Sequence, residues 1–143
     1  MRLLLDVNVL VALLDSAHVF SAKAYEWLDA QPRQIATCPI VENGAVRVMS
    51  SPGYSATHRA TPIQVAQALQ AMTRQLNHQF WPDDASILDE KAFDVGRVHG
   101  HRQITDAYLL ALAVRHRGGL ATFDAAVSLS AVHGATKRHL TLL

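Results

Sequence analysis

Apolar residues along the chain fall into two kinds of pattern, short continuous runs and longer stretches with helical spacing. The short runs predict buried β-strands, of which the first covers residues 2–5. Further strands are expected at residues 34–37, 79–81, 119–124 and 139–143. Between them, apolar positions recur every three or four residues, as in amphipathic helices. Because strands and helices alternate along the whole length, the pattern predicts an α/β fold with a mainly parallel sheet.

Capping residues mark where several of the predicted helices begin. The clearest helix covers residues 61–76, because Thr61 and Gln64 form a capping box around Pro62 at the first helical position. The helix that begins near Thr105 is expected to end at the glycines that follow RHR. The other helices are expected to start at Asn8, Ser21 (as N-cap), Pro39, Asp83 or Asp84, and Ala125.

Composition limits the class of protein without identifying it. A chain of 143 residues, half of them hydrophobic, is expected to fold as one domain over residues 1–143. The formal net charge of +1 gives no bulk argument for nucleic-acid binding. Cys38 is the only cysteine, which excludes an intrachain disulfide. The first apolar run is too short and too polar for a membrane span or a signal peptide, so we expect a cytoplasmic location without membrane contact.

Asp6 is the least expected residue in the first apolar run, because it follows three leucines and precedes more apolar positions. Removing an unpaired carboxylate from water costs on the order of several kcal/mol. A helix N-cap, a cationic side chain or a metal ion could each stabilise it.

Three further acids occupy similar places. Asp124 ends a predicted strand, while Glu42 and Asp106 lie in the first turns of predicted helices. In a parallel sheet all these positions meet at the carboxyl edge, where such folds bind ligands. Taken singly, each acid could simply cap a helix or face solvent. Together they favour a divalent cation, and all-oxygen ligands suit Mg²⁺ or Mn²⁺ and a phosphodiester substrate.

Four stretches carry these acids in order, and together they resemble the acidic motifs of PIN domains. The stretches are LLLDVNVLVALL, CPIVENGAVRVMS, ITDAYLLALAV and LATFDAAV. They are most similar to those of VapC-type toxins of type II toxin–antitoxin systems. The resemblance covers essentially the whole chain. It implies a PIN-like three-layer fold, with a mainly parallel five-stranded sheet flanked by helices.

The resemblance also implies an activity, that of a magnesium-dependent endoribonuclease that hydrolyses RNA phosphodiester bonds with a metal-activated water. Mg²⁺ is the implied cofactor, with Mn²⁺ as a possible substitute. The implied catalytic residues are Asp6, Glu42, Asp106 and Asp124. Of these, Asp6, Asp106 and Asp124 would be metal ligands, and Glu42 would hold a metal-bound water or assist proton transfer.

Supporting roles follow for residues next to the acids. Asn8 matches a position whose amide could orient Asp6, and Thr105 a hydroxyl that could do the same for Asp106 or touch substrate. Relatives often carry Ser or Thr at position 7, where Val7 stands here. The implied partners are an RNA substrate such as tRNA or rRNA, a cognate antitoxin protein and a second copy of the chain.

Basic residues near Asp106 are candidates for RNA contact. For His99, His101 and Arg102, phosphate contact and plain surface solvation are equally compatible with the sequence. The role of His18 stays open between structure and catalysis.

Other functions fit less well. A haloacid-dehalogenase-type phosphatase needs a second acid where Asn8 stands, and a dinucleotide-binding module needs a glycine-rich turn after the first strand. The remaining alternative is a catalytically silent PIN-like module that binds RNA or protein.

Overall fold

Five parallel strands form one sheet in the order β3-β2-β1-β4-β5 in the computed structural model, which describes residues 1–55 and 59–143. The first strand along the chain therefore lies at the centre of the sheet. The strands are β1 (Leu3–Leu5), β2 (Gln34–Thr37), β3 (Asn77–Phe80), β4 (Gly119–Thr122) and β5 (Leu140–Leu142).

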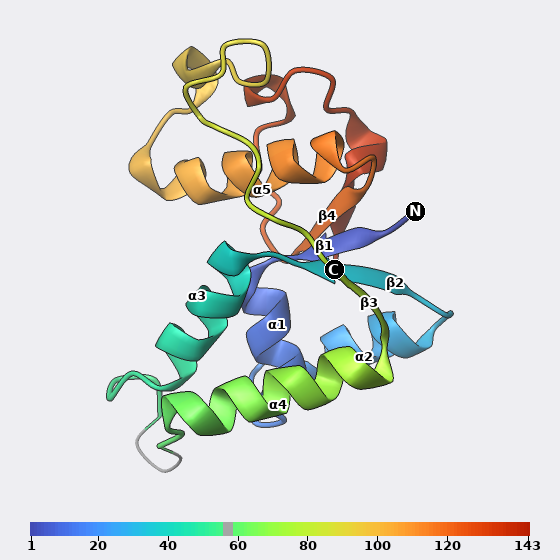
Figure 1. Ribbon diagram of the computed structural model, residues 1–143, viewed down its shortest axis with the longest axis vertical. Helices are drawn as coiled ribbons and strands as arrows, with labels where there is room; N and C mark the ends of the chain where they lie inside the picture. The colour runs from blue at the N-terminus through green and yellow to red at the C-terminus, as the bar shows by residue number, and fades with distance from the viewer. Residues whose placement is uncertain (56–58) are drawn as a thin grey trace.

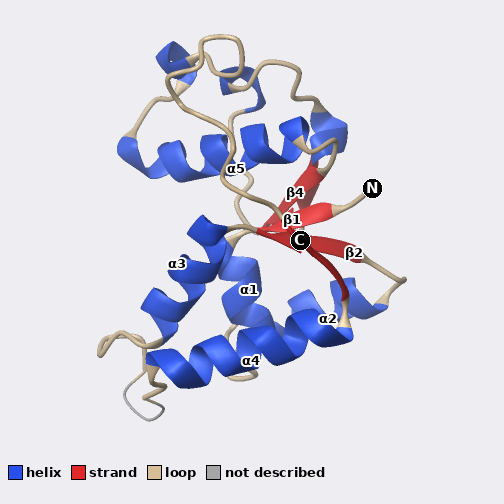
Figure 2. Cartoon of the chain, in the orientation of Figure 1, coloured by secondary structure: helices blue, strands red, loops and turns tan. Residues whose placement is uncertain are grey.

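Helices cover both faces of this sheet and give the three layers that the sequence predicts. Figure 1 shows α1 to α4 on one face, and α5 with the turns that precede and follow it on the other. Figure 2 shows the strands as a narrow layer between these helices. The helices are α1 (Val7–Leu14), α2 (Ser21–Asp29), α3 (Pro39–Met49), α4 (Pro62–Gln75) and α5 (Ile104–Arg115). Among the helices of the described ranges, none is both long and apolar enough to cross a membrane.

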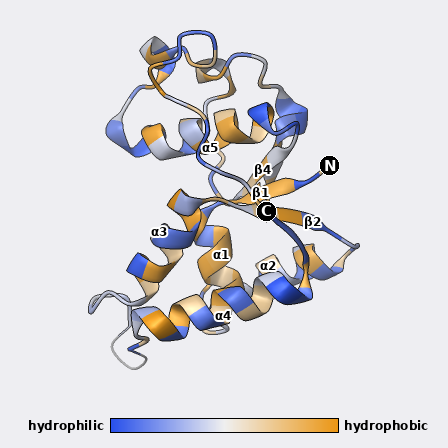
Figure 3. Cartoon of the chain, viewed as in Figure 1, coloured by the Kyte–Doolittle hydropathy of each residue, from blue (hydrophilic) through white to orange (hydrophobic). Residues whose placement is uncertain are grey.

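The core forms where the central strands meet α1 and α5. Leu4 and Leu5 of β1, Leu10 of α1 and Leu109 of α5 are completely buried. Figure 3 shows the hydropathy of these elements, with mainly apolar β1 and α1 inside and alternating polar and apolar bands along the outer helix α4. Because these leucines are buried on both faces of the sheet, β1 is held in place, and Asp6 lies where β1 ends.

Two predicted helices are absent. Residues 83–95 form turns up to the short 3-10 helix η1 (Val95–Arg97), and the segment after Ala125 forms turns up to η3 (Leu129–Ala131). Apolar spacing was a poor guide because short polar side chains bind the backbone locally. The Ser86 hydroxyl accepts from the Leu88 N–H at 3.2 Å, and Asp89 accepts from the Lys91 N–H at 3.0 Å.

Some helix boundaries also differ from the prediction. Phe20 and Gln103 are the N-caps of α2 and α5, so Ser21 and Thr105 lie inside the helices rather than capping them. The capping box of Thr61 and Gln64 at α4 is confirmed.

The glycine after α5 serves a close approach rather than an unusual backbone conformation. Arg117 takes the left-handed φ of 55°. A Cβ on Gly118 would lie only 2.5 Å from the Arg2 carbonyl oxygen and from a ring carbon of Trp81. Gly118 thus allows α5 to return directly into β4, beside β1.

Candidate active site

Asp6 follows β1 directly and caps α1 at the carboxyl edge of the sheet. Its Oδ1 accepts from the Val7 N–H at 2.6 Å, and its Oδ2 accepts from the Thr122 hydroxyl at 2.9 Å. The residue is only 6% exposed. Of the three explanations for its burial, the helix N-cap is therefore confirmed. No cationic side chain pairs with it in the described ranges.

Thr122 joins two of the acidic segments. It is the last residue of β4, it is completely buried, and its hydroxyl oxygen also accepts from the Asp124 N–H at 3.1 Å. One hydroxyl thus orients the Asp6 carboxylate and anchors the backbone at Asp124.

Asp106 completes a group of three acids. It lies in the first turn of α5, while Asp124 is exposed just beyond β4. Burial, and after it the charges of Asp6 and Asp124, raise the pKa of Asp106 to about 6. Burial also raises the pKa of Asp6, and the Asp124 charge adds to this effect. The structure therefore brings together Asp6, Asp106 and Asp124, from three segments far apart in the sequence, within electrostatic reach.

Glu42 points toward the neighbouring strands instead. Its Oε1 accepts from the Thr37 hydroxyl at 2.5 Å, and the same hydroxyl lies 2.7 Å from Nε2 of His78. Since the Thr37 hydroxyl donates its one hydrogen bond to Glu42, it accepts the second one, and Nε2 of His78 is the donor. Burial lowers the pKa of His78, which favours its neutral form. Glu42 is thus linked to β2 and β3, and no hydrogen bond within residues 1–55 and 59–143 links it to the three aspartates.

The predicted supporting residues Asn8 and Thr105 donate no hydrogen bond to these acids in the part of the chain that the structure describes. Asn8 and Thr105 are exposed, and the hydrogen bonds to Asp6 come from Val7 and Thr122. Val7 instead fills the space over α3, since a Cβ on Gly44 would meet its Cγ2 at 2.6 Å. The three candidate RNA contacts are exposed in the segment that leads into α5, namely His99, His101 and Arg102.

The donor set suits a hydrated divalent cation better than a closed metal cage. No three His, Cys, Asp or Glu side chains among residues 1–55 and 59–143 lie close enough to bind one ion together. Mg²⁺ keeps several waters and needs only one or two protein carboxylates. Asp6 and Asp106, both with a raised pKa, gain most from such a charge.

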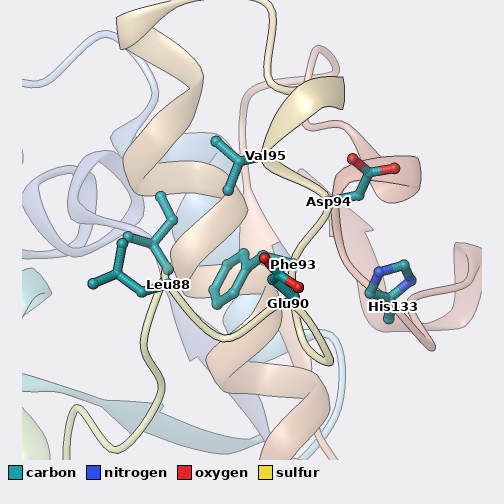
Figure 4. A pocket seen from close by; sticks show the side chains of 7 residues that line it. Leu88, Glu90, Phe93, Asp94, Val95 and His133 are labelled. Carbon is teal, nitrogen blue, oxygen red and sulfur yellow. The ribbon is translucent and has the colours of Figure 1, made fainter.

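A separate cavity of about 500 Å³ lies between the loop before α5 and the turns after β4. Figure 4 shows Leu88, Phe93 and Val95 lying over α5, with Glu90 beside Phe93 and with Asp94 and His133 at the other side. None of the three aspartates lines this cavity.

Sequence reasoning missed three residues that organise the acidic edge. Thr37 and Thr122 are both the last residue of a central strand, and both donate to a carboxylate. That shared position was a readable signal, whereas nothing local to His78 indicates its contact with Thr37.

Comparison with known proteins agrees with this geometry. Residues 3–132 match the PIN domain family. The chain is 50% identical to Ribonuclease VapC44 of Mycobacterium tuberculosis over 147 residues, which cover 100% of both chains. It is 44% identical to Ribonuclease VapC39 of the same species over 135 residues, 94% of this chain and 96% of the relative.

Two solved structures share the fold. M. tuberculosis VapC20, a sarcin-ricin loop cleaving toxin, has a TM-score of 0.64 at 13% identity and covers 94% of this chain and 97% of its own. VapBC2 from Rickettsia felis, bound to a DNA fragment from its promoter, has a TM-score of 0.51 at 17% identity, covering 87% and 89%.

With the parallel sheet, its acidic carboxyl edge and the match over residues 3–132, the chain belongs to the PIN domain family. The full-length identity to VapC44 and the identity to VapC39 place it, within that family, among the VapC ribonucleases. The resemblance first visible in the four acidic motifs is confirmed.

Proposed function

We propose that this protein is a divalent-metal-dependent endoribonuclease that acts as the toxin of a toxin–antitoxin pair. The observation that carries the proposal is the group of Asp6, Asp106 and Asp124 at the sheet edge, where the mutual repulsion of the three acids and the burial of Asp6 and Asp106 favour a bound cation. The VapC relatives are named ribonucleases, which supports RNA as the substrate class.

In this proposal Asp6 and Asp106 would hold Mg²⁺ or Mn²⁺, and Asp124 would contribute through a water molecule, because the three carboxylates do not lie close enough to bind one ion together. Bound there, the cation neutralises charge on the phosphoryl oxygens and lowers the pKa of a water ligand. Thr122 holds Asp6 in one orientation, because its hydroxyl donates a hydrogen bond to Oδ2. Asn8 and Thr105 lie one or two positions from these acids and would steady them or the substrate.

Glu42 has a different part in the proposed reaction. It is half-buried at the start of α3, and its carboxylate accepts a hydrogen bond from the Thr37 hydroxyl. Glu42 would turn from Thr37 toward the acidic group, where its carboxylate would hold the attacking water or accept the proton which that water loses. The exposed His99, His101 and Arg102 would contact RNA phosphates beside Asp106.

The proposed biological setting follows from the relatives. Rickettsia felis VapBC2 is a solved structure of this fold class that supports an antitoxin protein as the partner. We also propose a homodimer, and tRNA or rRNA as the RNA that is cut. We further propose that the protein acts in the cytoplasm.

The test is cleavage of purified tRNA and rRNA by the purified protein in Mg²⁺, with and without a chelator. We expect discrete cuts that disappear with the chelator and in the Asp6→Asn and Asp106→Asn variants. Glu90→Gln is a matched control, because Glu90 is exposed and lies outside the acidic group. RNA binding without any cleavage in Mg²⁺ or Mn²⁺ would instead support a catalytically silent module.

A further inference from the structure

Three aromatic rings lie in a row immediately beside the acidic edge. The rings of Phe20 and Phe123 stack with centroids 4.7 Å apart and planes at 27°. The His18 ring lies 5.9 Å from that of Phe20, tilted by 47°. Phe123 stands between Thr122, which holds Asp6, and Asp124 itself. The row of rings is therefore joined to the acidic site by the backbone, because Phe123 is the chain neighbour of both Thr122 and Asp124.

The outer ring of the stacked pair is open to solvent. Phe20 is 42% exposed, whereas Phe123 is partly buried and packs against the core. Phe20 also forms the N-cap position of α2 without a side-chain cap. Neither helix capping nor core packing explains a large aromatic ring held half in water at this place.

The backbone around Phe20 is fixed before any ligand arrives. The Phe20 N–H donates to Nδ1 of His18 at 3.1 Å, and the Ser21 N–H donates to the His18 carbonyl oxygen at 2.9 Å. This gives His18 a structural part in the turn between α1 and α2. A ring held this way loses little conformational freedom when another ring stacks on it.

We propose that Phe20, supported from below by Phe123, is a stacking platform for a nucleobase of single-stranded RNA next to the phosphate held at the acidic edge. The inference rests on the proposed function and deepens it, because it names an unpaired base as the feature that is bound. Bases splayed out of single strands stack on aromatic side chains, and each contributes measurably to binding. Because every base has a π-face, the platform tolerates many sequences.

The binding test compares two fluorescently labelled 12-nucleotide strands, a random-sequence RNA and an abasic ribose-phosphate strand. Both are measured in Mg²⁺ on the Asp106→Asn background, which keeps the RNA intact. We expect tighter binding of the base-bearing strand and a loss of about tenfold in Phe20→Ala and Phe20→Leu, with the abasic strand unaffected. Phe20→Trp should restore binding, and its fluorescence should be quenched by the base-bearing strand only.

Ile63→Ala is the matched control, since Ile63 is a large apolar side chain that is 65% exposed on α4. It should bind both strands as the unsubstituted background does. Equal binding of the two strands by that background, or RNA binding unchanged in Phe20→Ala and Phe20→Leu, overturns the proposal. The proposal is also overturned if the Phe20 variants bind RNA normally but no longer bind the antitoxin, because Phe20 would then be a contact for a protein. Cleavage by the wild-type chain in Mg²⁺ tests the proposed function separately.

Discussion

Replacing Asp106 with Asn separates the stability of this protein from its chemistry. The substitution keeps the shape and the helix-start position of the side chain but removes its charge. Asp106 is destabilised as an anion by burial and by the charges of Asp6 and Asp124. We therefore expect Asp106→Asn to make the metal-free protein more stable while it abolishes RNA cleavage.

The magnitude follows from the pKa of Asp106, which rises from 3.8 to about 6 in the folded protein. That difference corresponds to about 3 kcal/mol for a fully buried group. Since Asp106 is only partly buried, solvent screening leaves roughly half, or about 1–2 kcal/mol. The raised pKa means that the metal-free wild type loses this stability as the pH rises from about 4 to about 6. The stability of the Asp106→Asn variant should not fall over this pH range.

Urea unfolding at pH 7.5 in a chelator measures this gain directly. Adding Mg²⁺ should stabilise the wild type by mass action and leave Asp106→Asn almost unchanged. Glu90→Gln should behave as the wild type in both conditions, because Glu90 is an exposed acid outside the acidic group. If Asp106→Asn is less stable than the wild type in the chelator, the repulsion argued here does not exist.

Three further predictions follow from contacts at the same edge. Thr122→Val removes the donor to buried Asp6, so it should cost about 1–3 kcal/mol and weaken Mg²⁺ binding, whereas Thr122→Ser should retain both in unfolding and calorimetric measurements; equal behaviour of Val and Ser would contradict the role of the hydroxyl. Gly44→Ala places a Cβ against Val7 and should cost about 1–3 kcal/mol in urea unfolding, with recovery in the double variant that also carries Val7→Ala; a loss without recovery would place the strain elsewhere. Mg²⁺ affinity should fall about tenfold for each pH unit below 6, because the cation must displace the Asp106 proton. An affinity that does not change between pH 5 and 7 would contradict this prediction.

The positions of Asp6, Asp106 and Asp124 were predictable because the ends of strands can be recognised in the sequence, whereas Glu42, expected at the same edge, contacts Thr37 instead. Burial of Leu3–Leu5 marks β1, so Asp6 has to emerge at the edge where parallel strands end. The same reasoning placed Asp124 beyond β4 and Asp106 at the start of α5. Here the periodicity of the sequence and the topology of the sheet lead to the same place.

The polar contacts around the acids were less predictable, because they join residues far apart in the chain. Thr122 donates to Asp6 across 116 positions, and Thr37 meets His78 across 41. Single-sequence patterns report local backbone preferences and burial, but not such pairings. The helix predicted over residues 83–95 fails to form for a local reason, because hydrogen bonds from the backbone to the side chains of Ser86 and Asp89 outweigh the regular apolar spacing.

Calorimetric titration of Mg²⁺ into the wild-type protein and into Asp6→Asn tests the central claim most directly. We predict saturable uptake by the wild type and none by the variant, because Asp6 is the buried carboxylate that gains most from the cation. A wild-type protein that takes up no Mg²⁺, or a variant that binds it equally well, would contradict the account.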